Sequence, residues 1–244
     1  MKKPEITSLF KYCPIGKNQL SALAQKKIWY SKPASFNDPF DTRFHVVGNL
    51  HSYVQETEAQ KLKRIFGEDM SDAIVKEKVS LEPELMQFRQ GIEELGILSL
   101  ADSNNNLLMW SHYAEDHKGM CLEFERKDGE VLASSDSTQP IFYTDNHPTL
   151  SPKSLLNKAA ALTSKKRILY AKSKHWGYER EWRHIVKNGN RLHPWSAPLK
   201  AVYFGCKVEA SDINLVKSVI ADPTINYFQA HQYSDVFGVY FKKC

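Results

Sequence analysis

Short β-like runs and longer helical runs follow one another along almost the whole chain, and this mixture most constrains the fold. Residues 120–125 alternate between apolar and other side chains, as a half-exposed strand does. Residues 211–220 instead have apolar side chains at helical spacing, and the aromatic, alternating stretch over 226–241 is typical of a hairpin. The pattern therefore predicts an α+β fold with a mixed or antiparallel β-core and flanking helices.

The other elements are assigned by the same reasoning. Further strands are expected at residues 8–12, 28–31, 97–101, 141–144, 179–186 and 201–204. Asn18 would cap a short helix through Ala24, residues 154–171 would form another helix, and Pro223 would terminate the helix over 211–220. No repeat, low-complexity tract or linker interrupts residues 1–244, so we expect a single domain.

Residues 54–95 are a charged stretch with helical periodicity. Its apolar positions include Ile65, Phe66, Met70, Ile74 and Val75. Ser80 followed by Pro83 is typical of the start of a further helix. We expect this stretch to be a helical insertion or lid.

Charge and composition narrow the class of protein. The net charge of +5 suits an anionic ligand such as a nucleotide or nucleic acid. The sequence has neither a secretory signal nor an apolar run of membrane-spanning length, so we expect a cytoplasmic protein with no membrane partner. Its oligomeric state is not predicted. The cysteines, which are scattered and expected to be structural thiols, are Cys13, Cys121, Cys206 and Cys244.

The first of three polar segments covers residues 37–41, where Asn-Asp-Pro predicts a turn because a proline disfavours helical backbone in the residue before it. It would be either an Asx turn that places Phe36 and Phe40 in the core, or a loop that presents polar side chains to a ligand. These side chains are Asn37, Asp38 and Asp41.

The second segment covers residues 109–119 and is expected to be a helical turn. In a helix Trp110 and Tyr113 would share one face, while His112 and Asp116 would share another. Two histidines beside two carboxylates point to chemistry or to ligand binding, or else the histidines are structural.

A metal is not expected at these histidines. His112 and His117 have i to i+5 spacing, whereas two ligands on one helical face need i to i+3 or i+4. His112 is therefore retained as a candidate catalytic residue that acts without a metal.

The third segment covers residues 178–183. On a strand, alternation would put Glu179, Glu181 and Arg183 on one face. The opposite, largely aromatic face would carry Tyr178, Arg180 and Trp182. The charged face would be either a solvated charge ladder or a cleft in which Arg183 holds one acid while the other is free to act.

These segments resemble the signature of a bacterial family of unknown function. The matching motifs are Lys11-Tyr12, Asn37-Asp38-Pro39-Phe40-Asp41, Ser99, Met109-Trp110-Ser111-His112-Tyr113, His117-Lys118-Gly119, Lys174 with Trp176, Tyr178-Glu179-Arg180-Glu181-Trp182-Arg183 and Val202-Tyr203-Phe204-Gly205. The resemblance spans most of the chain and implies no particular activity.

The chain also resembles ADP-ribosyltransferases, which use NAD and share a split β-core. In chain order that family has an Arg, His or similar residue on the first strand, a Ser or Tyr on a later strand, and a Glu, often as Glu-x-Glu, on a third. The corresponding residues here are Lys11-Tyr12, Ser99 and Glu179-Arg180-Glu181. The first position departs from Arg or His, and Ser99 is not part of a Ser-Thr-Ser run.

This second resemblance implies NAD as the substrate and a protein or nucleic acid as the acceptor, in a bacterial defence or toxin context. It implies Glu181, with Glu179, as the acid that stabilises the ribose cation or activates the acceptor. The residues that would contact NAD are Lys11, Tyr12, Asn37, Arg43, Ser99 and Tyr113.

Two other functions fit overlapping residues. A non-catalytic module would bind a nucleotide or a protein in the same pocket.

Dinucleotide-binding and P-loop folds are not expected, because the glycine motif of neither fold occurs in the sequence. A metal-assisted hydrolase or nuclease would instead use Asp38, Asp41, His112, His117 and Glu181.

Overall fold

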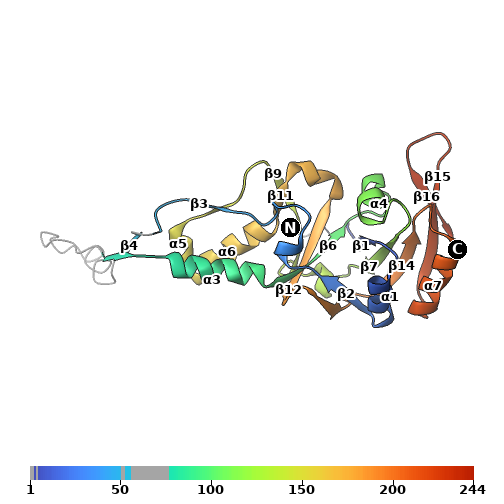
Figure 1. Ribbon diagram of the computed structural model, residues 1–244, viewed down its shortest axis with the longest axis horizontal. Coiled ribbons are helices and arrows are strands. Elements are labelled where there is room, and N and C mark those ends of the chain that lie inside the picture. The colour runs from blue at the N-terminus through green and yellow to red at the C-terminus, as the bar shows by residue number, and fades with distance from the viewer. Residues whose placement is uncertain (1–2, 4, 51–52, 56–76) are drawn as a thin grey trace, which may run out of the picture. The chain divides into compact units, whose positions relative to one another are not determined.

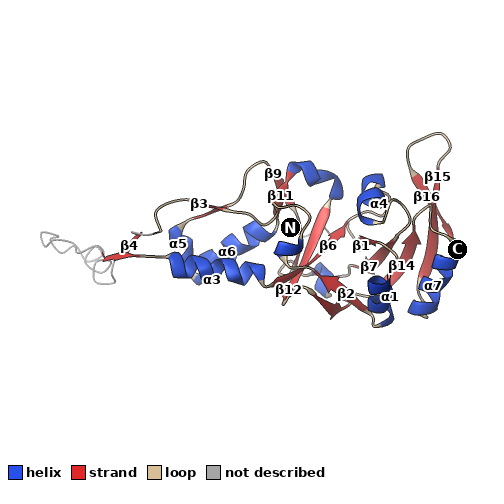
Figure 2. Cartoon of the chain, viewed as in Figure 1, coloured by secondary structure: helices blue, strands red, loops and turns tan. Residues whose placement is uncertain are grey.

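The computed structural model forms two compact units (Figure 1). It describes residues 3, 5–50, 53–55 and 77–244. The larger unit combines residues 1–41, 94–145 and 170–244, and the smaller unit combines residues 42–93 and 146–169. Helices and strands are mixed along the chain (Figure 2), which confirms the predicted α+β class. None of the helices in the described part is long and apolar enough to cross a membrane.

In the part of the chain that the structure describes, a mixed sheet of eight strands organises the larger unit. Its spatial order is β16 (Val239–Lys243), β15 (Asn226–Gln232), β14 (Leu199–Phe204), β7 (Met120–Glu125), β1 (Ser8–Cys13), β6 (Leu95–Ala101), β12 (Glu181–Lys187) and β8 (Thr138–Pro140). The pair β14 and β15 is parallel and the other neighbours are antiparallel. The predicted closing hairpin is β15 with β16.

The sheet is divided between β1 and β6. β1 pairs with β7 along its whole length, and β6 pairs with β12 along its whole length. Between β1 and β6, in contrast, the register within the described residues is the single pair Phe10↔Ala101. Because the two strands part beyond this pair, the sheet consists of two halves with room between them. This agrees with the expected split β-core.

Helices cover both faces of the sheet. They are α1 (Lys17–Ala24), α4 (Leu107–Tyr113) and α7 (Ala210–Ile220). α1 and α7 pack on the main core, to which β7 contributes Leu122. Trp110 of α4 packs on the opposite face, against Cys121 of β7. β7 is therefore buried on both faces, and the prediction that one face is exposed was wrong. The alternation of apolar and polar residues in a sequence does not show whether a helix also covers the more polar face of the strand.

Shorter elements complete the larger unit. They are β2 (Lys27–Tyr30), β9 (Phe142–Thr144), β11 (Ala171–Ser173), β13 (Arg191–Pro194) and the 3-10 helices η1 (Pro33–Ser35), η2 (Val131–Ala133) and η3 (Lys174–Glu179). β2 pairs antiparallel with β13, and β9 pairs parallel with β11. Gly16 rather than Asn18 occupies the N-cap of α1, so Asn18 lies within the helix.

The smaller unit contains more of the chain than the predicted insertion. Its elements are β3 (His45–Val46), β4 (Tyr53–Gln55), β5 (Glu77–Val79), α3 (Glu82–Glu93), β10 (Thr149–Leu150), α5 (Pro152–Leu155) and α6 (Lys158–Leu169). α3 starts after Ser80, as expected, but the predicted apolar positions from Ile65 to Val75 lie outside the described residues. The helix expected over 154–171 is divided into α5 and α6, where Asn157 Oδ1 accepts a hydrogen bond from Ala160 N at 3.0 Å and starts a new helix.

Candidate active site

A cavity of about 750 Å³ lies within the larger unit, at the division between β1 and β6. Residues of β1, β6 and β12 line it together with residues of α1 and β2. Seven of the predicted site residues are in this lining, namely Lys11, Tyr12, Asn37, Ser99, Tyr113, Glu179 and Glu181. Segments that are far apart in the sequence therefore meet at one place.

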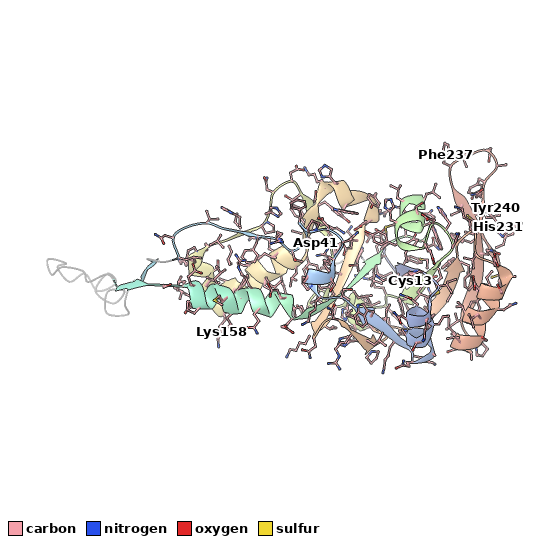
Figure 3. All side chains as sticks on the ribbon, viewed as in Figure 1. Cys13, Asp41, Lys158, His231, Phe237 and Tyr240 are labelled. Carbon is pink, nitrogen blue, oxygen red and sulfur yellow. The ribbon has the colours of Figure 1, made fainter. Side chains whose placement is uncertain are left out.

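Arg183 holds two carboxylates at the polar part of the cavity. Its Nη1 and Nη2 donate to the two oxygens of Asp41, at 2.9 and 2.5 Å, and its Nε donates to Glu181 Oε1 at 2.8 Å. Asp41 and Cys13, which both line the cavity, are labelled in Figure 3. The ring of Phe36 lies against the guanidinium, with its centroid 5.3 Å from Cζ. All three charged side chains are buried. Paired, charge-assisted hydrogen bonds of this kind are strong and directional, so they fix the position of Glu181.

Lys172 joins the second glutamate to this network. Its Nζ donates to Glu179 Oε2 and, at 3.1 Å, to Glu181 Oε2. Tyr113 donates its hydroxyl to the other oxygen of Glu179, and the ring of Trp176 lies 4.9 Å from Lys172 Nζ. The predicted solvated charge ladder is therefore excluded, because both glutamates are buried and hydrogen-bonded.

The two glutamates differ in their protonation. Burial raises the pKa of Glu179 above its ordinary value, Lys172 opposes this effect, and the charge of Glu181 adds to it. Burial acts on Glu181 in the same direction, but Arg183 and Lys172 outweigh it and lower the pKa of Glu181 to about 2. Glu181 is thus permanently ionised near neutral pH, whereas Glu179 takes up a proton more readily. A pair divided in this way can combine charge stabilisation with proton transfer.

A left-handed residue brings both glutamates into the cavity. Glu179 ends η3, Arg180 has a φ of 47°, and β12 begins at Glu181. The strand predicted from residue 179 therefore starts two residues later, and strand alternation does not explain the direction of Glu179. Arg180 instead forms an ion pair with Asp102 at 2.8 Å. The predicted faces are correct for Glu181, Arg183 and Trp182, the last of which lies in the main core.

Lys11 and Ser99 connect the two halves of the sheet. Lys11 Nζ donates to the main-chain oxygen of Ser99 at 3.1 Å. Ser99 lies opposite Arg183 in the β6–β12 register, and a hydrogen bond from its side chain helps to lower the pKa of Glu181. The motif positions of β1, β6 and β12 are therefore neighbours in space.

Three further predicted contacts line the cavity and already have partners. Tyr12 donates its hydroxyl to Ser103 O at 2.9 Å, and its ring packs in the second core cluster. Asn37 Nδ2 lies 3.5 Å from the hydroxyl of Tyr113, which donates to Glu179. Tyr113 and Asn37 therefore belong to the hydrogen-bond network of Glu179, whereas Tyr12 is mainly a core residue at the edge of the cavity.

His112 does not belong to the lining that the structure describes for this cavity. It is exposed on α4, and its Nδ1 lies 3.0 Å from the hydroxyl of Tyr178. The helix ends at Tyr113, so Asp116 does not share a helical face with His112, contrary to prediction. The position of His112 does not support the catalytic role expected for it.

His117 has a structural position. It is the last of three consecutive residues with left-handed backbone, with a φ of 70°. Its Nε2 lies 3.2 Å from the hydroxyl of Ser111, and its ring stacks on Trp110. The main chain of Gly205 approaches so closely that an added Cβ would lie 2.0 Å from His117 O. This contact explains why the sequence needs glycine at position 205.

The turn at residues 37–41 is the predicted Asx turn, because Asp38 Oδ1 accepts from Phe40 N at 2.9 Å. Phe40 is 66% exposed, so its predicted place in the core was wrong. Asp41 is buried instead, since Arg183 binds it. Arg43 belongs to the smaller unit and is not part of the site that the larger unit builds from its own residues.

Sequence reasoning did not identify Lys172. It lies in the short strand β11, and no motif distinguishes it from Lys165 or Lys166. A weak signal is its position directly after the apolar run over 168–171, where a lysine is expected to be buried and paired.

Metal chemistry has less support than the paired glutamates. Among the described residues, no group of three or more His, Cys, Asp or Glu side chains is arranged to hold a metal ion.

A model of the family described as protein of unknown function (DUF2971) matches residues 109–184. The matched region includes α4, β11, η3 and the start of β12, and so contains Tyr113, Lys172, Glu179, Glu181 and Arg183. The chain matches no curated protein and no solved structure. The similarity thus covers part of the charged lining of the cavity, without Lys11 and Asp41, and assigns no reaction to it.

Proposed function

We propose that the protein is an ADP-ribosyltransferase-like enzyme that uses NAD and acts on a protein or nucleic-acid acceptor. The observation that carries this proposal is the convergence of three motif positions on one cavity at the division of the sheet. Lys11 comes from β1, Ser99 from β6, and the Glu-x-Glu pair from the start of β12. The cavity volume is in the range of sites that enclose a small organic ligand.

The electrostatics of the pair suit cleavage of a glycosidic bond. When the bond between the ribose carbon and the nicotinamide nitrogen breaks, the electron pair leaves with nicotinamide and positive charge develops on the ribose. Glu181 is ionised and held in place by Arg183 and Lys172, so it would stabilise that charge without having to reorient.

Glu179 would complete the transfer. The acceptor atom attacks the ribose carbon and must lose a proton, which a nearby carboxylate can take. A pKa raised towards the working pH makes Glu179 the better proton carrier of the two glutamates. Tyr113 and Lys172 would hold its carboxylate in position.

The test is incubation with NAD labelled in the nicotinamide ring. Wild-type protein should release nicotinamide, and Glu181→Gln should lower the rate at least about 100-fold, the usual effect of removing one preorganised electrostatic contact. Glu123→Gln is the matched control, because Glu123 is also buried in the sheet but lies outside the cavity lining. It should retain activity.

Two results would overturn the proposal. One is NAD turnover that is unchanged in a folded Glu181→Gln protein. The other is saturable binding of NAD with no release of nicotinamide under any acceptor condition, which would indicate a non-catalytic binding module instead.

A further inference from the structure

Lys11 lines the cavity without a carboxylate partner. Among the described residues, no Asp or Glu oxygen lies within 4.0 Å of its Nζ, and its hydrogen bond goes to the main-chain oxygen of Ser99. A main-chain oxygen can accept a hydrogen bond from an amine as well as from an ammonium ion, but it has no negative charge to neutralise the ion. Lys172, in the same cavity, has three carboxylate partners, namely Asp41, Glu179 and Glu181.

The charged and ionisable groups that act on Lys11 do not outweigh the effect of its burial. They are the thiols of Cys13 and Cys121 and the carboxylates of Glu179 and Glu181. Burial raises the pKa of Cys13 to about 12, and burial also raises the pKa of Cys121. Both thiols are therefore neutral near pH 7. The two glutamates are already bound by Lys172 and Arg183. Burial therefore lowers the pKa of Lys11 despite the attraction of these carboxylates.

We propose that Lys11 is a reactive amine that forms an imine with a small aldehyde or ketone in the cavity. A neutral amine at the edge of a pocket is a nucleophile, and lysines that lack a counter-ion in apolar surroundings serve in this way. The inference concerns Lys11 alone and does not depend on NAD.

The reaction balances with groups already present in the cavity. The nitrogen lone pair forms a bond to the carbonyl carbon, the carbonyl oxygen takes a proton, and the nitrogen loses one. The resulting hydroxyl leaves as water after a second protonation, and the carbon–nitrogen double bond forms as the remaining N–H proton is lost. Glu179, which lines the same cavity and holds a proton more readily than an ordinary glutamate, is suited to exchange these protons.

The cavity favours a small ligand with an apolar part. Its lining includes Leu100, Met120 and Leu122, and Leu122 lies opposite Lys11 in the β1–β7 register, so the amine has an apolar neighbour. An aldehyde or ketone with a short carbon chain fits this lining, whereas a phosphate would gain little from an amine that is partly uncharged.

The experiment is reductive trapping on the wild-type protein, so no variant has to fold. Propionaldehyde and cyanoborohydride are added at pH 7, and the rate of alkylation at each lysine is measured by peptide mass spectrometry. Lys11 should react at least about tenfold faster than the exposed Lys17 and Lys118, because each unit by which its pKa is lowered increases the amine fraction about tenfold. Lys172 should remain unmodified.

The pH dependence separates reactivity from access. Between pH 7 and 9, the alkylation rate of Lys11 should level off at a lower pH than the rates of the exposed lysines. In Lys11→Arg the fast adduct should disappear while the other sites react as before. The proposal is wrong if Lys11 reacts no faster than the exposed lysines at pH 7, or if its rate rises with theirs over the whole pH range.

Discussion

Lys172 and Lys11 line the same cavity in opposite surroundings. Burial by itself would lower the pKa of Lys172, but Glu181 and Glu179 outweigh it and raise the pKa above its ordinary value. Lys11 lacks such partners, and burial lowers its pKa. Lys172 on β11 is thus a fixed cation, whereas Lys11 on β1 loses its proton more easily than an ordinary lysine. The difference teaches that hydrogen-bond partners, rather than residue type, decide what a buried lysine can do here.

The same contrast extends to stability. In the Lys172 region every charge depends on another, since Asp41, Glu179 and Glu181 share Lys172 and Arg183. Removing one member leaves a buried charge without compensation. Lys11 has no ion pair with any of the described residues, so its substitution should change the free energy of unfolding less than a substitution in the Lys172 region.

The largest effect is expected for Arg183→Met, which leaves Asp41 and Glu181 without their main partner. The free energy of unfolding should fall by about 3–5 kcal/mol, the usual cost of breaking a buried ion pair. Urea denaturation measures it. Lys174→Met is the control, because its ion pair with Asp145 is exposed and should contribute less than about 1 kcal/mol. Equal losses in both variants would contradict the role assigned to the buried network.

A somewhat smaller effect is expected from acid. The pKa of Glu181 is about 2 in the folded protein against 4.5 ordinarily, so its ionisation stabilises the fold above about pH 4.5 and this contribution is lost as the pH falls towards 2. The loss amounts to roughly 3 kcal/mol. Protonation of Glu179, whose pKa is raised, favours the folded state and opposes part of the loss.

Glu181→Gln isolates this contribution. The free energy of unfolding of the variant should depend less on pH than that of the wild type between about pH 5 and pH 2. Parallel curves for the two proteins in that interval would show that Arg183 and Lys172 do not hold the pKa of Glu181 low.

The smallest effect is expected for Lys11→Met. Because Lys11 has no carboxylate partner in the described part of the chain and donates one hydrogen bond to a main-chain oxygen, the substitution should change the free energy of unfolding by less than about 1 kcal/mol. Lys172→Met, measured by the same urea titration, should cost clearly more. If the two variants were equally destabilised, the contrast between the lysines would not hold.

Local pattern was sufficient for several elements. β6, β14, α7 and the β15–β16 hairpin lie close to where the apolar pattern of the sequence placed them. The burial of β7 on both faces was not predictable. Its side chains contribute to two different core clusters, and the alternation of residues in the sequence indicates only one buried face. The break between α5 and α6 depends on a single capping residue, Asn157, within a continuous helical pattern.

The candidate site also has features that the sequence predicts and features that it does not. By itself, the sequence determined which residue types were available, namely the Glu-x-Glu pair, Ser99 and the lysine of β1, and it indicated the strands that carry them. Only the tertiary structure decided that the pKa of Glu181 is lowered, that the pKa of Glu179 is raised, and that Lys172 binds both glutamates. These properties depend on burial and on distances to charges far along the chain, which the spacing of residues in a sequence does not contain.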